Sequence, residues 1–163
     1  MDDNRQVCDF TIFGVLGDLS RRKLIPSLYQ LDRAELLHPD TRIIGVARHD
    51  ISQEDFVNQM RQALETFVNQ PLDQDVVDRL LARLRYVLIN LDVPEEYNRL
   101  KDVLDQDKRV FISYFSVAPS LFDDICTGLH YAGVITPEAR VVLEKPIGRD
   151  LATSQEINDT VAR

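Results

Sequence analysis

Two glycines three residues apart, Gly14 and Gly17, follow the apolar run of residues 10–13 and precede a helical pattern. They stand where a strand passes into a helix. Glycine permits a tight turn and a close approach to a ligand, and the free N–H groups at the start of a helix favour phosphate oxygens. The block is shorter than the full G-x-G-x-x-G fingerprint. We predict that residues 14–20 hold a pyrophosphate, with a turn that binds nothing as the alternative.

Arg48 ends the second predicted strand, where a dinucleotide-binding sheet usually recognises the adenosine ribose. A carboxylate at this point suits NAD, whereas a guanidinium can donate two N–H groups to a 2′-phosphate and stack on adenine. The position therefore predicts NADP. An ordinary surface arginine is the alternative, and Asp50 leaves dual use of NAD and NADP open. His49 is read as an exposed loop residue that could also contact the adenosine phosphate.

The remaining candidates follow the other predicted strands. In an open parallel sheet, ligands bind beyond the carboxyl ends of the strands, so these segments should gather along one edge. They are Asp92 and Val93, residues 116–119, and Lys145 with Pro146. The ammonium of Lys145 is expected to project over the cleft and donate to a sugar hydroxyl or a phosphate. A plain turn at the end of a strand also explains Asp92 and Val93.

Several polar residues near the predicted turns have structural interpretations. Asp18 stands at the entrance of the first helix, and we expect its side chain to turn back onto backbone N–H groups as a cap. Ser120 is a candidate cap for the helix after the fourth strand. The cluster of residues 21–23 either helps to hold a phosphate or is a set of solvated charges.

Strand-like and helix-like patterns alternate along the chain, which predicts a parallel sheet with helices on its faces and right-handed crossovers. Five mostly apolar runs are the predicted strands, at residues 9–13, 42–47, 86–91, 110–115 and 140–144. The expected fold class is α/β. It is a Rossmann-like, doubly wound parallel sheet that ends after about five strands, and residues 1–163 form one domain.

The predicted helices fill the intervals between these strands. They cover residues 23–34, two segments within 52–84 separated at Pro71, and residues 95–105, 120–132 and 151–163. Ser52 and Asp55 form a capping-box pattern at the start of the second interval, and Asp150 is the expected cap of the last helix.

Composition narrows the class of protein. With 163 residues, 44% hydrophobic and 28% charged positions, the chain has the size and composition of one soluble domain. A net charge of −8 argues against unspecific binding to nucleic acid or to an anionic membrane. We see no membrane segment and no His/Cys spacing typical of a metal site. Cys8 and Cys126 are read as buried thiols, which favours a cytoplasmic protein.

Four segments resemble one enzyme family. Residues 13–24 (FGVLGDLSRRKL) closely resemble the coenzyme loop of glucose-6-phosphate dehydrogenase, and residues 43–48, 114–119 and 141–148 are similar to later segments of that family in the same order. The resemblance implies an NADP-binding domain. The cofactor contacts that it implies are Gly14, Leu16, Gly17, Asp18, Leu19, Arg48, Asp92, Val93, Pro119 and Lys145. It also implies that Lys145 touches the substrate, glucose 6-phosphate.

The family activity is hydride transfer from C1 of glucose 6-phosphate to NADP in the oxidative pentose phosphate pathway, with a histidine base oriented by an aspartate. The family's chains are much longer, and the resemblance stops at Arg163, before the histidine-bearing segment and the substrate and dimerisation domain. We therefore expect weak NADP binding without turnover, and oligomers only in full-length relatives. Leu16 replaces a common serine or threonine, a loss of about 1 kcal/mol in binding.

Two other functions remain open from the sequence. One is a stand-alone nucleotide-binding or regulatory module without catalysis. The other is an NAD-linked oxidoreductase acting on a different sugar, in which replacing Arg48 would change the coenzyme affinity little.

Overall fold

A single parallel sheet organises the chain in the computed structural model, which describes residues 7–104 and 109–143. Within these residues the strands are β1 (Cys8–Phe13), β2 (Arg42–Ala47), β3 (Leu84–Leu88), β4 (Val110–Phe115) and β5 (Arg140–Leu143). Their spatial order is β3-β2-β1-β4-β5, and every neighbouring pair is parallel. The strand order thus reverses between β1 and β4, which confirms the predicted Rossmann-like, doubly wound α/β fold.

The third strand differs from its predicted position. It begins at Leu84 and ends at Leu88, whereas the apolar run predicted residues 86–91. Its register explains the difference, because Leu88 pairs with Ala47, the last residue of β2. After that pair the chain leaves the sheet. The other strands start and end within one residue of the prediction, except that residue 144 lies outside the described residues.

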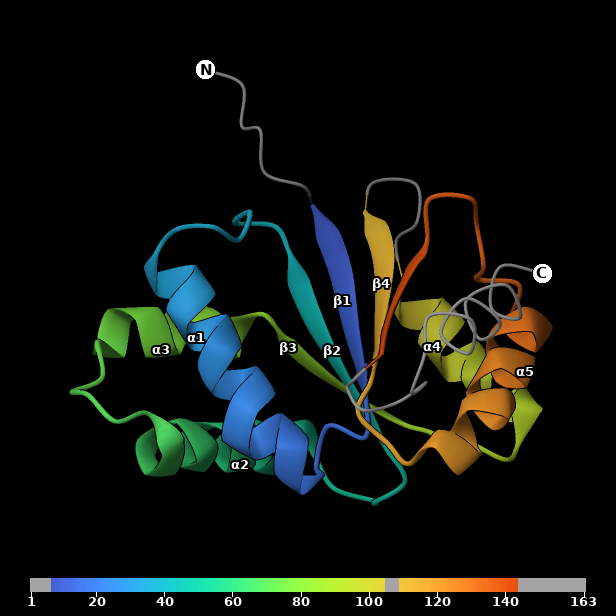
Figure 1. The fold of residues 1–163 in the computed structure, drawn as a ribbon, viewed down its shortest axis with the longest axis horizontal. Coiled ribbons are helices and arrows are strands. Elements are labelled where there is room, and N and C mark those ends of the chain that lie inside the picture. The colour runs from blue at the N-terminus through green and yellow to red at the C-terminus, as the bar shows by residue number, and fades with distance from the viewer. Residues whose placement is uncertain (1–6, 105–108, 144–163) are drawn as a thin grey trace.

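Helices cover both faces of the sheet (Figure 1). On one face lie α1 (Ile25–Arg33), α2 (Gln53–Phe67) and α3 (Gln74–Ala82), and on the other lie α4 (Asn98–Val103) and α5 (Phe122–Ala132). Each face has its own apolar core. Phe56 and Met60 are fully buried in the first, and Tyr97 and Phe115 in the second. The two covered faces account for the nearly unbroken apolar sequence of β2.

A short π-helical or 3-10 turn directly precedes each of the helices α1, α4 and α5. Helical backbone starts at Asp18 and continues through a π-helical turn (Ser20–Leu24) into α1, so the first helical segment begins five residues earlier than residue 23. A 3-10 turn (Pro94–Tyr97) leads into α4, and another (Pro119–Leu121) leads into α5. The predicted last helix, residues 151–163 with Asp150 as its cap, lies outside the described residues.

Ser52 is the predicted cap that the structure confirms. Its hydroxyl accepts a hydrogen bond from the Asp55 N–H at 3.0 Å at the start of α2. Asp73 caps α3 in the same way, through the N–H groups of Asp75 and Val76.

Two predicted caps are wrong. The carboxylate of Asp18 accepts from Nε of Arg22 at 2.7 Å and makes no cap, because Asp18 already lies inside the first helical turn and its side chain is exposed. Ser120 lies inside the 3-10 turn. The helix α5 therefore begins after Leu121, without any capping side chain.

The turn after β1 is a point of close backbone contact. Gly14 has a φ of +83°, and its N–H donates to the carbonyl of Val46 at 2.9 Å. A Cβ atom at this position would overlap the carbonyl oxygen of Ser116 and lie 2.6 Å from Cγ1 of Val117. Only glycine satisfies both the conformation and the space. The ends of β1, β2 and β4 therefore meet at a residue without a side chain.

Both cysteines are buried and free, which confirms the predicted buried thiols. Burial raises the pKa of Cys8 and raises that of Cys126 to about 11. Both sulfurs therefore remain protonated thiols of low reactivity at neutral pH.

Gly14→Ala should destabilise the fold more than Gly133→Ala. Gly133 also has a positive φ, +71°, but no atom lies within 4 Å of the added Cβ, so alanine there should lower the free energy of unfolding by about 1–2 kcal/mol. At Gly14 the overlap with Ser116 adds a packing cost of about 1–3 kcal/mol. Urea denaturation of the two variants measures the difference, and equal losses would contradict the close contact at Gly14.

Candidate functional site

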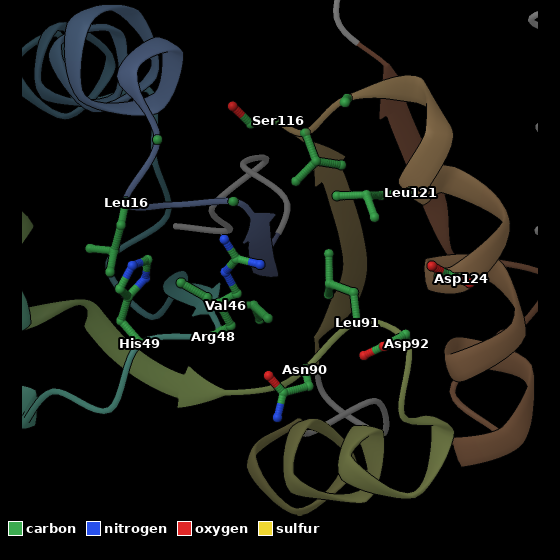
Figure 2. Close-up of a pocket in the computed structure, with 15 residues that line it drawn as sticks. Leu16, Val46, Arg48, His49, Asn90, Leu91, Asp92, Ser116, Leu121 and Asp124 are labelled. Atoms are coloured by element: carbon green, nitrogen blue, oxygen red, sulfur yellow. The ribbon is translucent and has the colours of Figure 1, made fainter.

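A cleft of about 530 Å³ opens at the carboxyl edge of the sheet, where the strand order reverses (Figure 2). It is lined by the turn after β1, the end of β2, the segment after β3, the loop after β4 and the first turn of α5. This is the position at which open α/β sheets bind their ligands. The topology thus brings together segments that lie more than 100 residues apart, from Gly14 to Asp124.

The structure brings half of the predicted cofactor residues to this cleft. Gly14, Leu16, Gly17, Arg48 and Asp92 line it. The loop of residues 116–118 and His49, which the sequence also marked, lie there as well.

Four predicted residues are near the cleft in sequence but do not line it. Asp18 pairs with Arg22 on the exposed surface, and Leu19 continues into the helix. Val93 directly precedes one 3-10 turn and Pro119 is the first residue of another. Lys145 and Pro146 lie outside the described residues.

The turn after β1 leaves backbone donors available. The N–H groups of Gly14 and Val15 both donate to the Val46 carbonyl, and that of Gly17 donates to the Gly14 carbonyl at 3.0 Å. Within the described residues, the N–H groups of Leu16 and Asp18 have no hydrogen-bond partner. Together with the start of the helix, they provide the kind of donors that bind phosphate oxygens.

Arg48 and His49 extend from the end of β2 on one side of the cleft (Figure 2). Arg48 is exposed and has no hydrogen bond or ion pair among the residues that the structure describes. Arg22, in contrast, is engaged by Asp18 and by the ring of Phe67, whose centroid is 5.1 Å from its guanidinium carbon. Arg48 therefore remains available to a ligand.

The opposite side of the cleft is acidic and was largely missed from the sequence. Asp92 follows β3, and Asp124 stands in the first turn of α5 (Figure 2). Asn90 and Leu91 also line this side, but the prediction had placed both inside the third strand. The sequence does contain an indication that Asp124 lines the cleft, because this residue follows the predicted loop of residues 116–119 by about one helical turn.

A hydrogen-bond network holds the segment after β3. The backbone N–H and the side-chain amide of Asn90 both donate to the carboxylate of Glu96, and Arg99 donates to the same carboxylate at 3.0 Å and to the Leu88 carbonyl at 2.7 Å. The bond from the Asn90 backbone, followed by the one from its side chain, lowers the pKa of Glu96. Glu96 is therefore ionised at neutral pH and fixes this wall of the cleft.

Two buried hydroxyl groups, those of Ser116 and Tyr97, lie between the cleft and the apolar core. The hydroxyl of Ser116 is buried and has no hydrogen-bond partner among the described residues. Tyr97 is fully buried in the core and donates to the carbonyl of the cleft residue Leu91 at 2.9 Å. Burial raises the pKa of Tyr97 far above its usual range. Tyr97 thus remains a neutral donor that supports the acidic wall.

The described part of the chain contains no group of three or more His, Cys, Asp or Glu side chains arranged to hold a metal ion. Across residues 7–104 and 109–143, none of the helices combines the length and apolarity that crossing a bilayer requires.

Comparison with known proteins gives a consistent match. The family model described as "Glucose-6-phosphate dehydrogenase, NAD binding domain" matches residues 11–163. Glucose-6-phosphate 1-dehydrogenase of Dickeya dadantii (strain 3937) is 48% identical over 157 residues, which are 96% of this chain and 32% of that protein. The enzyme of the same name from Mycolicibacterium smegmatis is 48% identical over 162 residues, 94% of this chain and 32% of the relative.

Solved structures agree with the sequence matches. The crystal structure of glucose-6-phosphate 1-dehydrogenase from Mycobacterium avium matches with a TM-score of 0.82 and 33% identity, over 97% of this chain and 34% of that one. A glucose-6-phosphate dehydrogenase in complex with its substrate glucose-6-phosphate matches with a TM-score of 0.78 and 31% identity, over 99% and 35%. The chain thus spans about a third of the length of these relatives. It belongs to the glucose-6-phosphate dehydrogenase family and corresponds to the N-terminal, NAD-binding domain of those longer proteins.

Proposed function

We propose that this chain binds NADP in the cleft and is the coenzyme-binding part of a glucose-6-phosphate dehydrogenase. The observation that carries the proposal is the position of Arg48, an unpaired guanidinium beside the glycine turn. A carboxylate in its place would favour NAD by accepting from the ribose hydroxyls. A guanidinium suits the extra phosphate of NADP, because it donates two parallel N–H groups to phosphate oxygens.

The residues of the cleft fit a dinucleotide. Gly14 lets the ends of β1, β2 and β4 approach closely beside the cleft, and the N–H groups of Leu16 and Asp18 are free to donate to a pyrophosphate. Arg48 would hold the 2′-phosphate, and the loop at Ser116 would lie along the nicotinamide ribose. When bound, NADP supplies the hydride acceptor. Leu16 has no hydroxyl to add to these contacts, so backbone donors carry the pyrophosphate.

The proposed reaction is transfer of the C1 hydride of glucose 6-phosphate to the coenzyme. The substrate is that of the homologous complex, which makes it the first candidate for this chain. In the proposal Asp92 faces the cofactor, Asp18, Leu19, Val93 and Pro119 remain possible contacts near it, and Lys145 touches both cofactor and substrate. The described cleft contributes binding and orientation, since its histidine, His49, is at the adenosine end.

Arg48→Ala should weaken NADP binding about 10- to 100-fold, because it removes charge-assisted hydrogen bonds to a phosphate. The affinity for NAD should change less than about twofold, since NAD lacks that phosphate. Calorimetric titration of NADP and NAD into wild type and variant measures both dissociation constants.

Two variants serve as controls for this titration. Arg48→Lys keeps the charge but loses the planar pair of donors, so it should fall between wild type and Arg48→Ala. Arg33→Ala removes an exposed arginine at the end of α1, outside the cleft, and should leave both affinities unchanged. Equal NADP affinities in wild type and Arg48→Ala would refute the assignment of the 2′-phosphate.

The chain alone should not form NADPH from glucose 6-phosphate. In the proposed mechanism the base is a histidine, and His49, the one histidine that lines the described cleft, stands beside Arg48 at the adenosine end; a positioned general base typically contributes about 10²–10⁴-fold to the rate. The measurement is NADPH fluorescence with highly purified chain, with a full-length relative as the positive control. Turnover in proportion to the concentration of the chain would show that its own residues are sufficient.

A further inference from the structure

We propose that Tyr86 is a positioning residue for NADP selectivity: its hydroxyl and backbone hold residues 48–52, here called the Arg48 loop, so that Arg48 faces the 2′-phosphate. This inference rests on the proposed function of Arg48. Tyr86 does not line the cleft, so it acts through the loop.

The hydroxyl of Tyr86 ties β3 to the Arg48 loop. It donates to the carbonyl oxygen of His49, the residue after Arg48, at 2.5 Å. The same carbonyl accepts from the Ile51 N–H at 3.1 Å, which closes a local turn. Burial raises the pKa of Tyr86, so the phenol stays protonated and remains a donor well above neutral pH. One bond from the neighbouring strand β3 thus reinforces the turn that directly follows Arg48.

The backbone of Tyr86 forms a second tie to the residue after the loop. Its N–H donates to Oε1 of Gln53 at 2.8 Å, and Nε2 of Gln53 donates to the Leu84 carbonyl at 2.8 Å. The strand β3 is at the edge of the sheet, so these backbone groups have no neighbouring strand on that side. The amide of Gln53 takes the place of such a strand. The Arg48 loop is therefore held at both of its ends by β3.

Packing fixes the ring that carries the hydroxyl. Tyr86 pairs in register with Gly45 of β2, and its ring lies against Phe56 of α2 with centroids 5.2 Å apart. A Cβ on Gly45 would lie 2.6 Å from Cζ of Phe56, so the missing side chain is what admits the Phe56 ring here. The phenol oxygen of Tyr86 thus has a defined position before any ligand binds.

Arg48 needs this support because it has none of its own. Its side chain is exposed and makes no hydrogen bond or ion pair within the described residues, so its direction depends on the backbone that carries it. Holding a binding group in the bound geometry lowers the entropy lost on binding. The benefit should fall on the contact that Arg48 makes, the 2′-phosphate, and not on the pyrophosphate at the glycine turn.

Tyr86→Phe tests the proposal, because it keeps the ring and removes the hydroxyl. We expect the dissociation constant for NADP to rise about 3- to 10-fold, the effect of losing one hydrogen bond, and that for NAD to change less than about twofold. In the Arg48→Ala background, Tyr86→Phe should have no further effect on NADP. A purely structural role would instead weaken NADP and NAD equally and persist in that background.

The controls separate this inference from the proposed function. Tyr131→Phe removes an exposed hydroxyl outside the cleft and should change neither affinity. If Arg48→Ala leaves NADP binding intact, the proposed function of Arg48 fails. If Arg48→Ala weakens NADP but Tyr86→Phe does not, the positioning role of Tyr86 is refuted. Gln53→Met removes the bonds of the Gln53 amide to the Tyr86 N–H and the Leu84 carbonyl, and it should weaken NADP binding without weakening NAD binding. If Tyr86→Phe does not fold, an equal effect of Gln53→Met on NADP and NAD would refute the proposal.

Discussion

The close backbone contact at Gly14 is the constraint on which the cleft depends. At this residue the end of β1 bonds to the Val46 carbonyl of β2 and lies against Ser116 beyond β4. A side chain would push these strand ends apart. Because the loops after β1 and β4 diverge to opposite faces from this point, the gap between them becomes the cleft, which Leu16 and Gly17 of the turn line.

Hydrogen bonds with residues that do not line the cleft hold its walls in place. Tyr86 braces the cationic side, where Arg48 is left unpaired, and the Asn90–Glu96 network braces the acidic side. The protein as a whole carries a charge of −8, yet its cleft presents a free guanidinium at the end of β2. Overall charge therefore says little about the ligand of this site, which local geometry decides.

Much of the fold followed from sequence periodicity, and the errors have physical causes. The third strand was misplaced because the apolar run of residues 86–91 continues past the point where β2 ends, and only the pairing of Leu88 with Ala47 shows where the sheet stops. That error also concealed Asn90 and Leu91 as cleft residues. The sequence predicts Asp18 as a cap because it cannot show that the helix already includes this residue.

By itself, the sequence determined the alternation of strands and helices, the glycine turn, the arginine at the end of the second strand and the family. These properties are local or appear as short motifs. Tertiary structure alone decided which residues from distant segments share one cleft, that the ring of Phe67 lies against Arg22 while Arg48 is free, and that a tyrosine on an edge strand holds the Arg48 loop. The Tyr86–His49 bond joins residues 37 positions apart, and the cleft combines residues from four strand ends, so no local pattern encodes these contacts because they arise from strand order and register.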